Sequence, residues 1–182
     1  MKLFSIILLT LLLHFNVHAT THYHNIQKIQ CDRGQGTAFQ IENGDIISAA
    51  HVNESNNHCT WGQSETVLSI KSRSTMLDFV SYTSEASLTS TMKYSCNRLS
   101  AGEEITVYGY PFGTDILYGS KGEIISINNQ TGVAFIDATV LPGMSGGPAI
   151  DNDGTAIGWI HGYVENHDIA VVFLFRNLYV CS

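Results

Sequence analysis

The chain has 182 residues, of which 44% are hydrophobic and 14% are charged, and its formal net charge is −7 at pH 7. This length fits one domain, or two small halves that share a core. The low charged fraction excludes a disordered chain and a coiled coil. The negative charge argues against nucleic acid as a partner, because phosphate binding needs a basic surface. We therefore expect a weakly charged globular protein.

Residues 1–19 have the pattern of a secretory signal peptide. Lys2 supplies a positive start, residues 3–13 form an apolar run, and Val17-His18-Ala19 is a small-x-small cleavage pattern. A membrane anchor is the alternative, but the run is too short for the ~20 residues that cross a bilayer. We expect cleavage after Ala19, a secreted or periplasmic protein, and no membrane contact after cleavage. His22 and His24 follow as an H-x-H pair, which could bind a metal. We expect instead that this segment is a solvated terminus.

Short β-like segments alternate with turns along the rest of the chain. Most are rich in β-branched or aromatic residues, and several alternate apolar with polar. Asn43-Gly44, Asn128-Asn129 and Asp153-Gly154 are hairpin-type turns between them. The predicted strands, in chain order, are 37–41, 45–49, 66–70, 79–82, 105–110, 121–127, 133–138, 149–150, 156–161 and 169–175.

About ten short strands at this spacing predict an all-β barrel or sandwich. The one helical candidate is Leu174 to Val180, at the end of the chain. A polar stretch from Ser84 to Glu103 interrupts the pattern, and we interpret it as the linker between two β halves. The expected organisation is a signal peptide at 1–19, a first half at 20–90 and a second half at 91–182.

The four cysteines all lie after the signal peptide. An even number in an exported chain suggests two disulfides, for which three pairings exist. Cys31 and Cys59 bracket one segment, which favours Cys31–Cys59 together with Cys96–Cys181. Four buried free thiols are the alternative. Metal binding is disfavoured because no C-x-x-C spacing occurs.

Three segments carry residues suited to nucleophilic catalysis. The strand Ile46 to Ala49 leads to His51, Asp78 directly precedes an apolar strand, and Ser145 lies in the glycine-rich loop Leu141 to Pro148. A serine attacks a carbonyl only when an oriented base removes its proton. A glycine-rich loop lets backbone N–H groups converge on one oxyanion. The order along the chain is His, Asp, Ser.

These segments resemble the chymotrypsin-like (trypsin-like) serine proteases. The resemblance rests on Gly36-Thr37-Ala38-Phe39 before the His51 strand and on Gly143-x-Ser145-Gly146-Gly147-Pro148, and it spans about residues 27–175. It implies two antiparallel six-stranded β-barrels packed together, each supplying part of the catalytic triad. The compact bacterial and viral members, including the high-temperature-requirement type, are the most similar.

The resemblance also implies a role for each residue. Ser145 would be the nucleophile, His51 the general base and then acid, and Asp78 the group that orients the imidazole. The N–H groups of Gly143 and Ser145 would form the oxyanion hole. For the position of Asp78, the competing acids Glu54, Glu65 and Glu85 are better explained as solvated.

Met144 departs from the pattern of the digestive and clotting members. Those enzymes have an Asp before the nucleophile, which pairs with a newly cut N-terminus, and Met144 cannot make that ion pair. Activation by such a cut is therefore not expected here.

Only a few residues of the sequence bear on which substrate side chain the protein would prefer. The strand 158–162 would run along the substrate, and Val140 to Gly143 would line the opposite wall of the pocket. By resemblance to relatives that cut after Glu or Gln, His161 would bind that side chain, with Gly162, Thr139 and Val140 beside it. A locally hydrogen-bonded strand histidine is the alternative. By the same resemblance, Thr139 would roughly occupy the position where enzymes that cleave after Lys or Arg have an Asp. The lack of an Asp there argues against such cleavage.

The sequence thus predicts a serine endopeptidase that acts on polypeptides and needs no cofactor or metal. A catalytically silent binding protein on the same scaffold is the alternative. An esterase is rejected because its G-x-S-x-G serine precedes the histidine in the chain and lies between a strand and a helix. The oligomeric state is not predicted.

Overall fold

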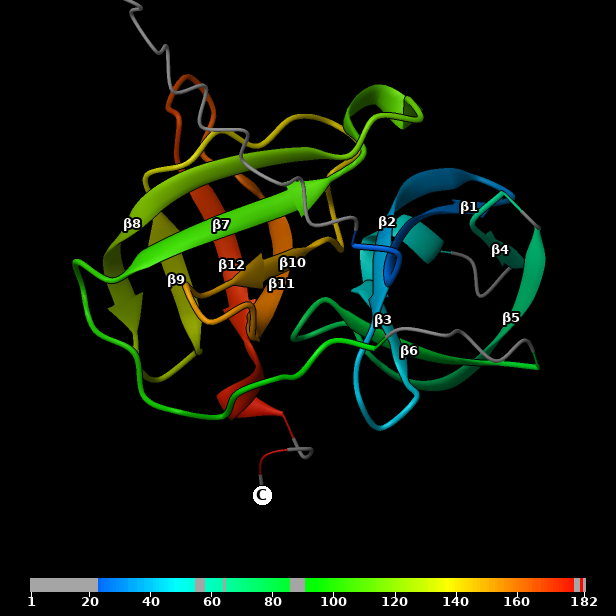
Figure 1. Cartoon of the computed structure of the whole chain (residues 1–182), viewed down its shortest axis with the longest axis horizontal. Coiled ribbons are helices and arrows are strands. Elements are labelled where there is room, and N and C mark those ends of the chain that lie inside the picture. The colour runs from blue at the N-terminus through cyan, green and yellow to red at the C-terminus, as the bar shows by residue number, and fades with distance from the viewer. Residues whose placement is uncertain (1–22, 55–57, 64, 86–90, 179–180, 182) are drawn as a thin grey trace, which may run out of the picture.

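The computed structural model describes residues 23–54, 58–63, 65–85, 91–178 and 181. The predicted signal peptide at 1–19 and His22 lie outside the described residues. Within the described part, no helix has the length and apolar character needed to cross a membrane. The described residues form twelve strands and three short 3₁₀ helices, and the strands make two barrels that lie side by side (Figure 1).

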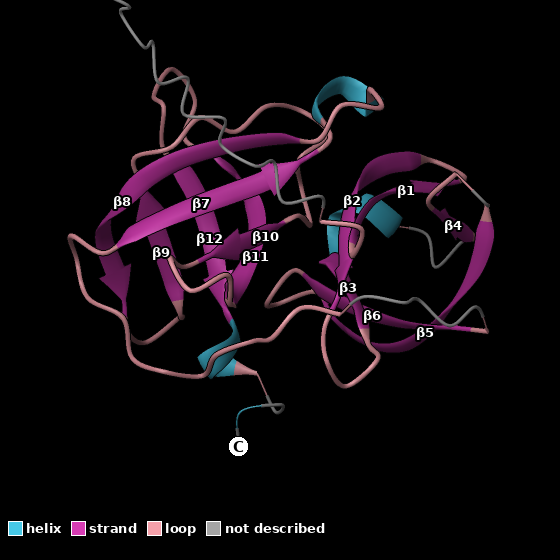
Figure 2. Cartoon of the chain, in the orientation of Figure 1, coloured by secondary structure: helices cyan, strands magenta, loops and turns pink. Residues whose placement is uncertain are grey.

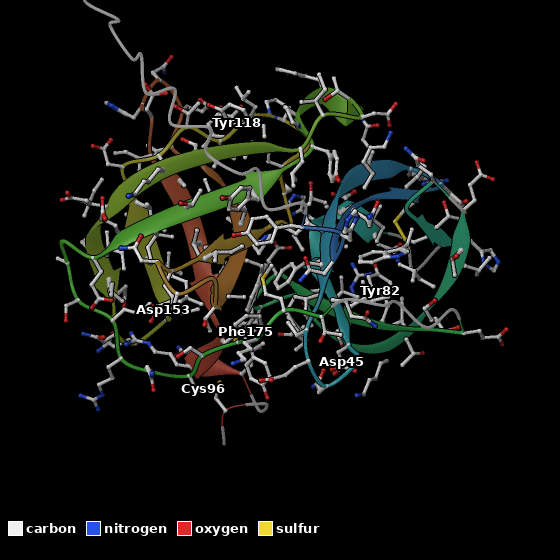
Figure 3. All side chains as sticks on the ribbon, viewed as in Figure 1. Asp45, Tyr82, Cys96, Tyr118, Asp153 and Phe175 are labelled. Carbon is white, nitrogen blue, oxygen red and sulfur yellow. A yellow bond between two sulfur atoms is a disulfide. The ribbon has the colours of Figure 1, made fainter. Side chains whose placement is uncertain are left out.

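The first barrel contains strands β1 to β6, closed in the order β1-β2-β3-β6-β5-β4. All neighbouring pairs are antiparallel. Its core is apolar, and the side chain of Tyr82, labelled in Figure 3, lies fully buried inside it. The strands are β1 (Ile26–Cys31), β2 (Gly34–Gln40), β3 (Ile46–Ala49), β4 (Cys59–Trp61), β5 (Thr66–Ser74) and β6 (Phe79–Ser84).

The second barrel contains strands β7 to β12, closed in the order β10-β11-β12-β9-β8-β7. Its neighbouring pairs are antiparallel as well. The strands are β7 (Glu104–Gly109), β8 (Tyr118–Asn128), β9 (Val133–Ile136), β10 (Pro148–Ile150), β11 (Ala156–Tyr163) and β12 (Ala170–Leu174). The prediction of an all-β fold with two six-stranded barrels is therefore confirmed.

Two expectations need correction. The predicted helix from Leu174 to Val180 is wrong: β12 extends to Leu174, and only the 3₁₀ helix η3 (Phe175–Asn177) follows it (Figure 2). The strand continues because the apolar residues before Phe175 pair with β9 and β11. Strands β1 and β4 were not predicted, since β1 is largely polar and β4 has three residues.

Both predicted disulfides are present. Cys31–Cys59 joins paired residues of β1 and β4 in the first barrel, and Cys96–Cys181 ties the segment between the barrels to the end of the chain. The chain contains no other cysteine, so the alternative of free thiols is excluded.

Aromatic side chains of both halves meet between the barrels. The ring of Trp159 on β11 lies 5.2 Å from that of Phe79 on β6, and Phe175 lies 6.2 Å from Phe39 on β2. Trp159 and Phe175 belong to the same buried cluster as the core of the first barrel. Burial of such rings contributes strongly to an interface. This packing fixes the two barrels against each other and so sets the geometry of the residues at their junction.

Candidate active site

His51 is presented by a short 3₁₀ helix at the end of β3. This helix, η1 (Ala50–Asn53), buries its other three side chains and leaves that of His51 partly exposed. The guanidinium of Arg73 on β5 donates hydrogen bonds to the carbonyl oxygens of Ala50, at 3.1 Å, and Asn53. The backbone on both sides of His51 is therefore held in place by a strand of the same barrel.

Asp78 lies in the turn between β5 and β6 and has a left-handed backbone, with φ +46°. Asp tolerates this conformation better than most residues. Its carbonyl oxygen accepts hydrogen bonds from the Ala50 N–H at 3.1 Å and from Trp159 Nε1 at 3.0 Å. The turn is thus bound both to the histidine-bearing helix and to the second barrel.

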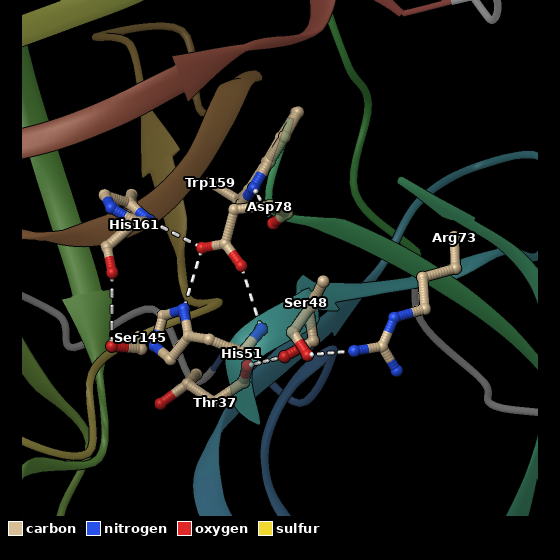
Figure 4. Close-up of polar contacts among 9 residues, drawn as sticks. Thr37, Ser48, His51, Arg73, Asp78, Ser145, Trp159 and His161 are labelled. Carbon is tan, nitrogen blue, oxygen red and sulfur yellow. Dashed lines mark hydrogen bonds and ion pairs between the residues drawn. The ribbon is translucent and has the colours of Figure 1, made fainter. Parts of the chain in front are cut away.

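The carboxylate of Asp78 accepts three hydrogen bonds. Oδ1 accepts the backbone N–H of His51 at 2.8 Å, whereas Oδ2 accepts Nδ1 of His51 at 2.7 Å and Nδ1 of His161 at 2.6 Å (Figure 4). Burial raises the pKa of Asp78, but the hydrogen bonds from His161 and His51 and the charge of His51 outweigh it and hold the pKa well below its usual range. Asp78 is therefore ionised at neutral pH.

Ser145 lies in the loop that precedes β10 and has glycines at two left-handed positions. Gly143 has φ +94° and Gly146 has φ +84°, backbone angles that residues other than glycine rarely adopt. The carbonyl oxygen of Ser145 accepts the N–H of Thr37 on β2 at 2.9 Å. Both barrels therefore contribute to the position of this serine.

The Ser145 hydroxyl donates to the carbonyl oxygen of His161 at 3.4 Å, beside the ring of His51 (Figure 4). No hydrogen bond joins Ser145 Oγ to His51 within the described residues. Catalytic hydrogen bonds often tighten only when substrate binds. Direct proton transfer from this serine to His51 requires such a tightening.

Two peptide groups of the loop are oriented by bonds to their carbonyl oxygens. The Pro142 oxygen accepts the Phe112 N–H at 2.6 Å, and the Met144 oxygen accepts the Gly147 N–H at 3.0 Å. In a trans peptide the N–H points away from the C=O. These bonds therefore set the direction of the N–H groups of Gly143 and Ser145, which have no acceptor among the described residues. Two such donors can bind an oxyanion.

The trypsin-like peptidase domain matches residues 36–158, which is more than half of the chain and includes all the loops described above. The chain belongs to the trypsin-like peptidase family. The resemblance stated from the sequence is thereby confirmed.

Individual relatives of this trypsin-like peptidase domain are distant. A serine protease HtrA-like protein of Staphylococcus epidermidis is 34% identical over 88 residues, covering 40% of this chain and 15% of that protein. An uncharacterised protein, y4bJ of Sinorhizobium fredii, is 38% identical over 63 residues, covering 31% of this chain and 10% of that protein. The chain thus spans only a small part of the curated relatives it matches.

Solved structures share the fold. The active form of the Rv3671c protease from Mycobacterium tuberculosis has a TM-score of 0.71 at 21% identity, covering 84% of this chain and 76% of that one. The serine endoprotease from Yersinia pestis has a TM-score of 0.72 at 16% identity, covering 84% of this chain and 59% of that one. These likenesses support the two-barrel architecture of the peptidase domain.

Thr37 is a site residue whose role the sequence did not reveal. Its fully buried side chain lies on β2, where Oγ1 donates to the Gly143 carbonyl oxygen at 2.9 Å and accepts the Tyr110 N–H at 3.0 Å. One hydroxyl of the first barrel thus holds two segments of the second. The neighbouring glycines were recognised as a motif of the peptidase family, but the pattern gave no sign of this bridge.

His161 is placed by an irregularity in β11. Ile160 pairs with Val172 and Gly162 pairs with Val171, so His161 is the extra residue of a β-bulge. A bulge re-aims side chains relative to a regular strand. The His161 ring points at Asp78 and packs against the edge of Phe173, with ring centroids 5.5 Å apart.

The other predicted pocket residues lie around the same end of the second barrel. Val140 is buried, and Thr139 Oγ1 donates to Asp168 at 3.3 Å while its N–H donates to Ser120. Gly162 has open space where a side chain would project. None of these three residues forms a hydrogen bond with the Asp78 carboxylate, to which the His161 ring is bonded.

His51, Asp78 and His161 also form a group of three potential metal ligands. Their contacts of 2.6 and 2.7 Å are hydrogen-bond distances. Two ligands on one tetrahedral Zn²⁺, each at about 2.0–2.1 Å, lie roughly 3.3 Å apart. The arrangement fits two N–H donors on a carboxylate better than it fits a zinc site.

A cavity of about 290 Å³ opens on the first barrel. Its lining comes mainly from β1, β2 and β4 and includes none of His51, Asp78, Ser145 or His161. We therefore locate the candidate active site by the geometry of these four residues and not by the cavity.

Proposed function

We propose that this trypsin-like peptidase domain is an exported serine endopeptidase that cleaves polypeptides through a triad of His51, Asp78 and Ser145. The observation that carries the proposal is the hydrogen bond from His51 Nδ1 to Asp78 at 2.7 Å, beside a serine whose loop presents two N–H groups that have no acceptor among the described residues. Because the Nδ1–H of His51 donates a hydrogen bond to the Asp78 carboxylate, Nε2 of the ring is free to accept a proton.

The proposed reaction follows from these positions. Ser145 Oγ attacks the substrate carbonyl carbon as His51 takes its proton, and the N–H groups of Gly143 and Ser145 stabilise the oxyanion. His51 then gives the proton to the leaving amine, which leaves an acyl group on Ser145. Water then attacks the ester carbonyl carbon while His51 takes its proton. His51 returns this proton to Ser145 Oγ as the ester bond breaks, which releases the carboxylic acid product and restores the free enzyme.

An extended substrate has a strand edge available beside the serine. On β11, pairing with β10 ends at Trp159, whereas pairing with β12 continues to Tyr163. Residues 161–163 therefore have one edge without a strand partner among the described residues. A peptide can bind such an edge through backbone hydrogen bonds. This supports a polypeptide substrate.

Export is proposed from the pattern of residues 1–19. The two disulfides support it, because such bonds persist mainly in secreted and periplasmic proteins. A preference for Glu or Gln before the cut remains a prediction from the sequence. With Nδ1 of His161 bonded to Asp78, this preference depends on Nε2 of the same ring reaching the substrate side chain.

A peptide-library cleavage profile of the purified chain tests the proposal. We expect Ser145→Ala to lower kcat by about 10⁶-fold and His51→Ala by a similar factor, with little further loss in the double variant. Ser126→Ala, an exposed serine on β8, is the matched control and should cleave like the wild type.

Labelling with a fluorophosphonate gives a second readout that needs no substrate. Ser145 Oγ should displace fluoride and gain the phosphonyl group in the wild type, and this product should be absent in His51→Ala. A folded wild-type chain that neither cleaves peptides nor reacts with the label would favour the silent binding protein.

A further inference from the structure

Two imidazole rings share one carboxylate oxygen in the active site. Nδ1 of His51 lies 2.7 Å and Nδ1 of His161 lies 2.6 Å from Oδ2 of Asp78. The two rings are nearly perpendicular, at 89°, with centroids 5.6 Å apart. The proposed mechanism uses only one of these histidines, so the second contact calls for a role of its own.

The position of His161 is built into the second barrel. Trp159 and His161 are two positions apart on β11, and both reach Asp78. Trp159 Nε1 donates to the carbonyl oxygen of Asp78 at 3.0 Å. The edge contact with Phe173 of β12 supports the ring. Trp159 and His161 thus fix the backbone and the carboxylate of one residue in the other barrel.

We propose that His161 is a positioning residue with two effects, an inference that rests on the proposed function. It holds the Asp78 carboxylate in the orientation that His51 needs, and its positive charge at acidic pH opposes protonation of His51. The enzyme thereby keeps an unprotonated base, and hence activity, to lower pH than it would with an uncharged residue at position 161.

The charged groups around the two rings indicate that His161 is protonated before His51 as the pH falls. The titratable groups that face His161 among the described residues are Asp78, from the β5–β6 turn, and His51, from η1; β12 contributes the uncharged Phe173. The hydrogen bond with Asp78 raises the pKa of His161, and the Asp78 charge adds to this, whereas burial opposes it. His161 therefore gains a proton readily as the pH falls.

A second positive charge on His51 is then unfavourable. One carboxylate would have to balance two imidazolium rings whose centroids are 5.6 Å apart. At this separation, an effective dielectric constant between about 80 and 20 gives a repulsion that displaces the midpoint of the acid limb of the activity profile by about 0.5 to 2 pH units. The two protonations are coupled, so the acid side of the activity profile belongs to the pair.

The test is the pH dependence of kcat/KM in His161→Asn. Asparagine has an amide nitrogen where histidine has Nδ1, so it keeps a donor for Asp78 but carries no charge. We expect kcat/KM at pH 8 to fall less in this variant than in one with an apolar residue at position 161, because the carboxylate is still held. The midpoint of the acid limb should rise by about 0.5 to 2 pH units.

Two further variants separate charge from position. His161→Leu removes both donor and charge, and we expect the same upward displacement together with roughly a tenfold lower kcat at pH 8. His58→Asn, an exposed histidine before β4, is the matched control and should leave the profile unchanged. An acid limb that stays in place or moves to lower pH in His161→Asn would overturn the proposal.

An NMR titration makes the outcome independent of peptidase activity. In the Ser145→Ala protein, the ring signals of His51 should titrate at a higher pH when His161→Asn is added. Equal midpoints with and without His161→Asn would refute the coupling. If the wild type cleaves no peptide, the proposed function fails, and the NMR comparison still decides whether the two histidines are coupled.

Discussion

Replacing Thr37 with valine tests whether one hydroxyl group holds the nucleophile loop. The variant keeps the shape of the buried side chain but leaves the Gly143 carbonyl oxygen and the Tyr110 N–H without their partner. Each unpaired group costs about 1–3 kcal/mol when it is buried, and both sites are only partly buried. We therefore expect the free energy of unfolding to fall by about 2–4 kcal/mol.

The melting temperature should fall accordingly, by about 5–12 °C for a domain of this size. We also expect kcat/KM to fall more than about tenfold, because Gly143 carries one of the two oxyanion donors. Urea unfolding, thermal melts and peptide cleavage measure these effects. Thr37→Ser is the matched control: it keeps the hydroxyl and should lose about 1 kcal/mol for the missing methyl group. Equal stability of Thr37→Val and Thr37→Ser would refute the reasoning.

Two further predictions concern the loop and the carboxylate. Gly146→Ala should lower the free energy of unfolding by more than about 3 kcal/mol, because the new Cβ would lie 2.2 Å from Ser48 Oγ. Gly154 also has a left-handed backbone but lies in open space, so Gly154→Ala should cost about 1–2 kcal/mol. Similar losses for the two variants in urea unfolding would argue against this. The lowered pKa of Asp78 stabilises the folded state above its unfolded pKa near 3.9, and this contribution is lost as pH falls through the folded pKa. The stability of the wild type relative to Asp78→Asn should therefore decline below about pH 4, and an advantage that stays constant down to pH 2 would contradict it.

The strands could be predicted from sequence, and the candidate site residues could be selected from it, because their signals are local. All ten predicted strands correspond to observed ones, and His51, Asp78 and Ser145 stand at the ends of such strands or in a glycine-rich loop. β1 escaped prediction because its alternation includes lysine and glutamine, and its burial depends on β2 and β4.

Contacts between the barrels could not be anticipated in the same way. The hydrogen bonds of Thr37 join residues 73 and 106 positions apart, and no periodicity encodes such a pair. The His161 ring likewise contacts a carboxylate 83 positions away, in the other barrel. The pattern therefore predicted the strand but not the target of its histidine.

The pairing of the cysteines has a consequence for the integrity of the enzyme. One disulfide lies within the first barrel, and the other joins Cys96 to Cys181, both on the second-barrel side of the chain. Neither crosses from barrel to barrel, so between Ser84 and Cys96 the main chain is the only covalent connection. A single nick in that segment would turn the active site into a bimolecular complex. That complex would be held by noncovalent packing between the barrels, such as that of Trp159 against Phe79.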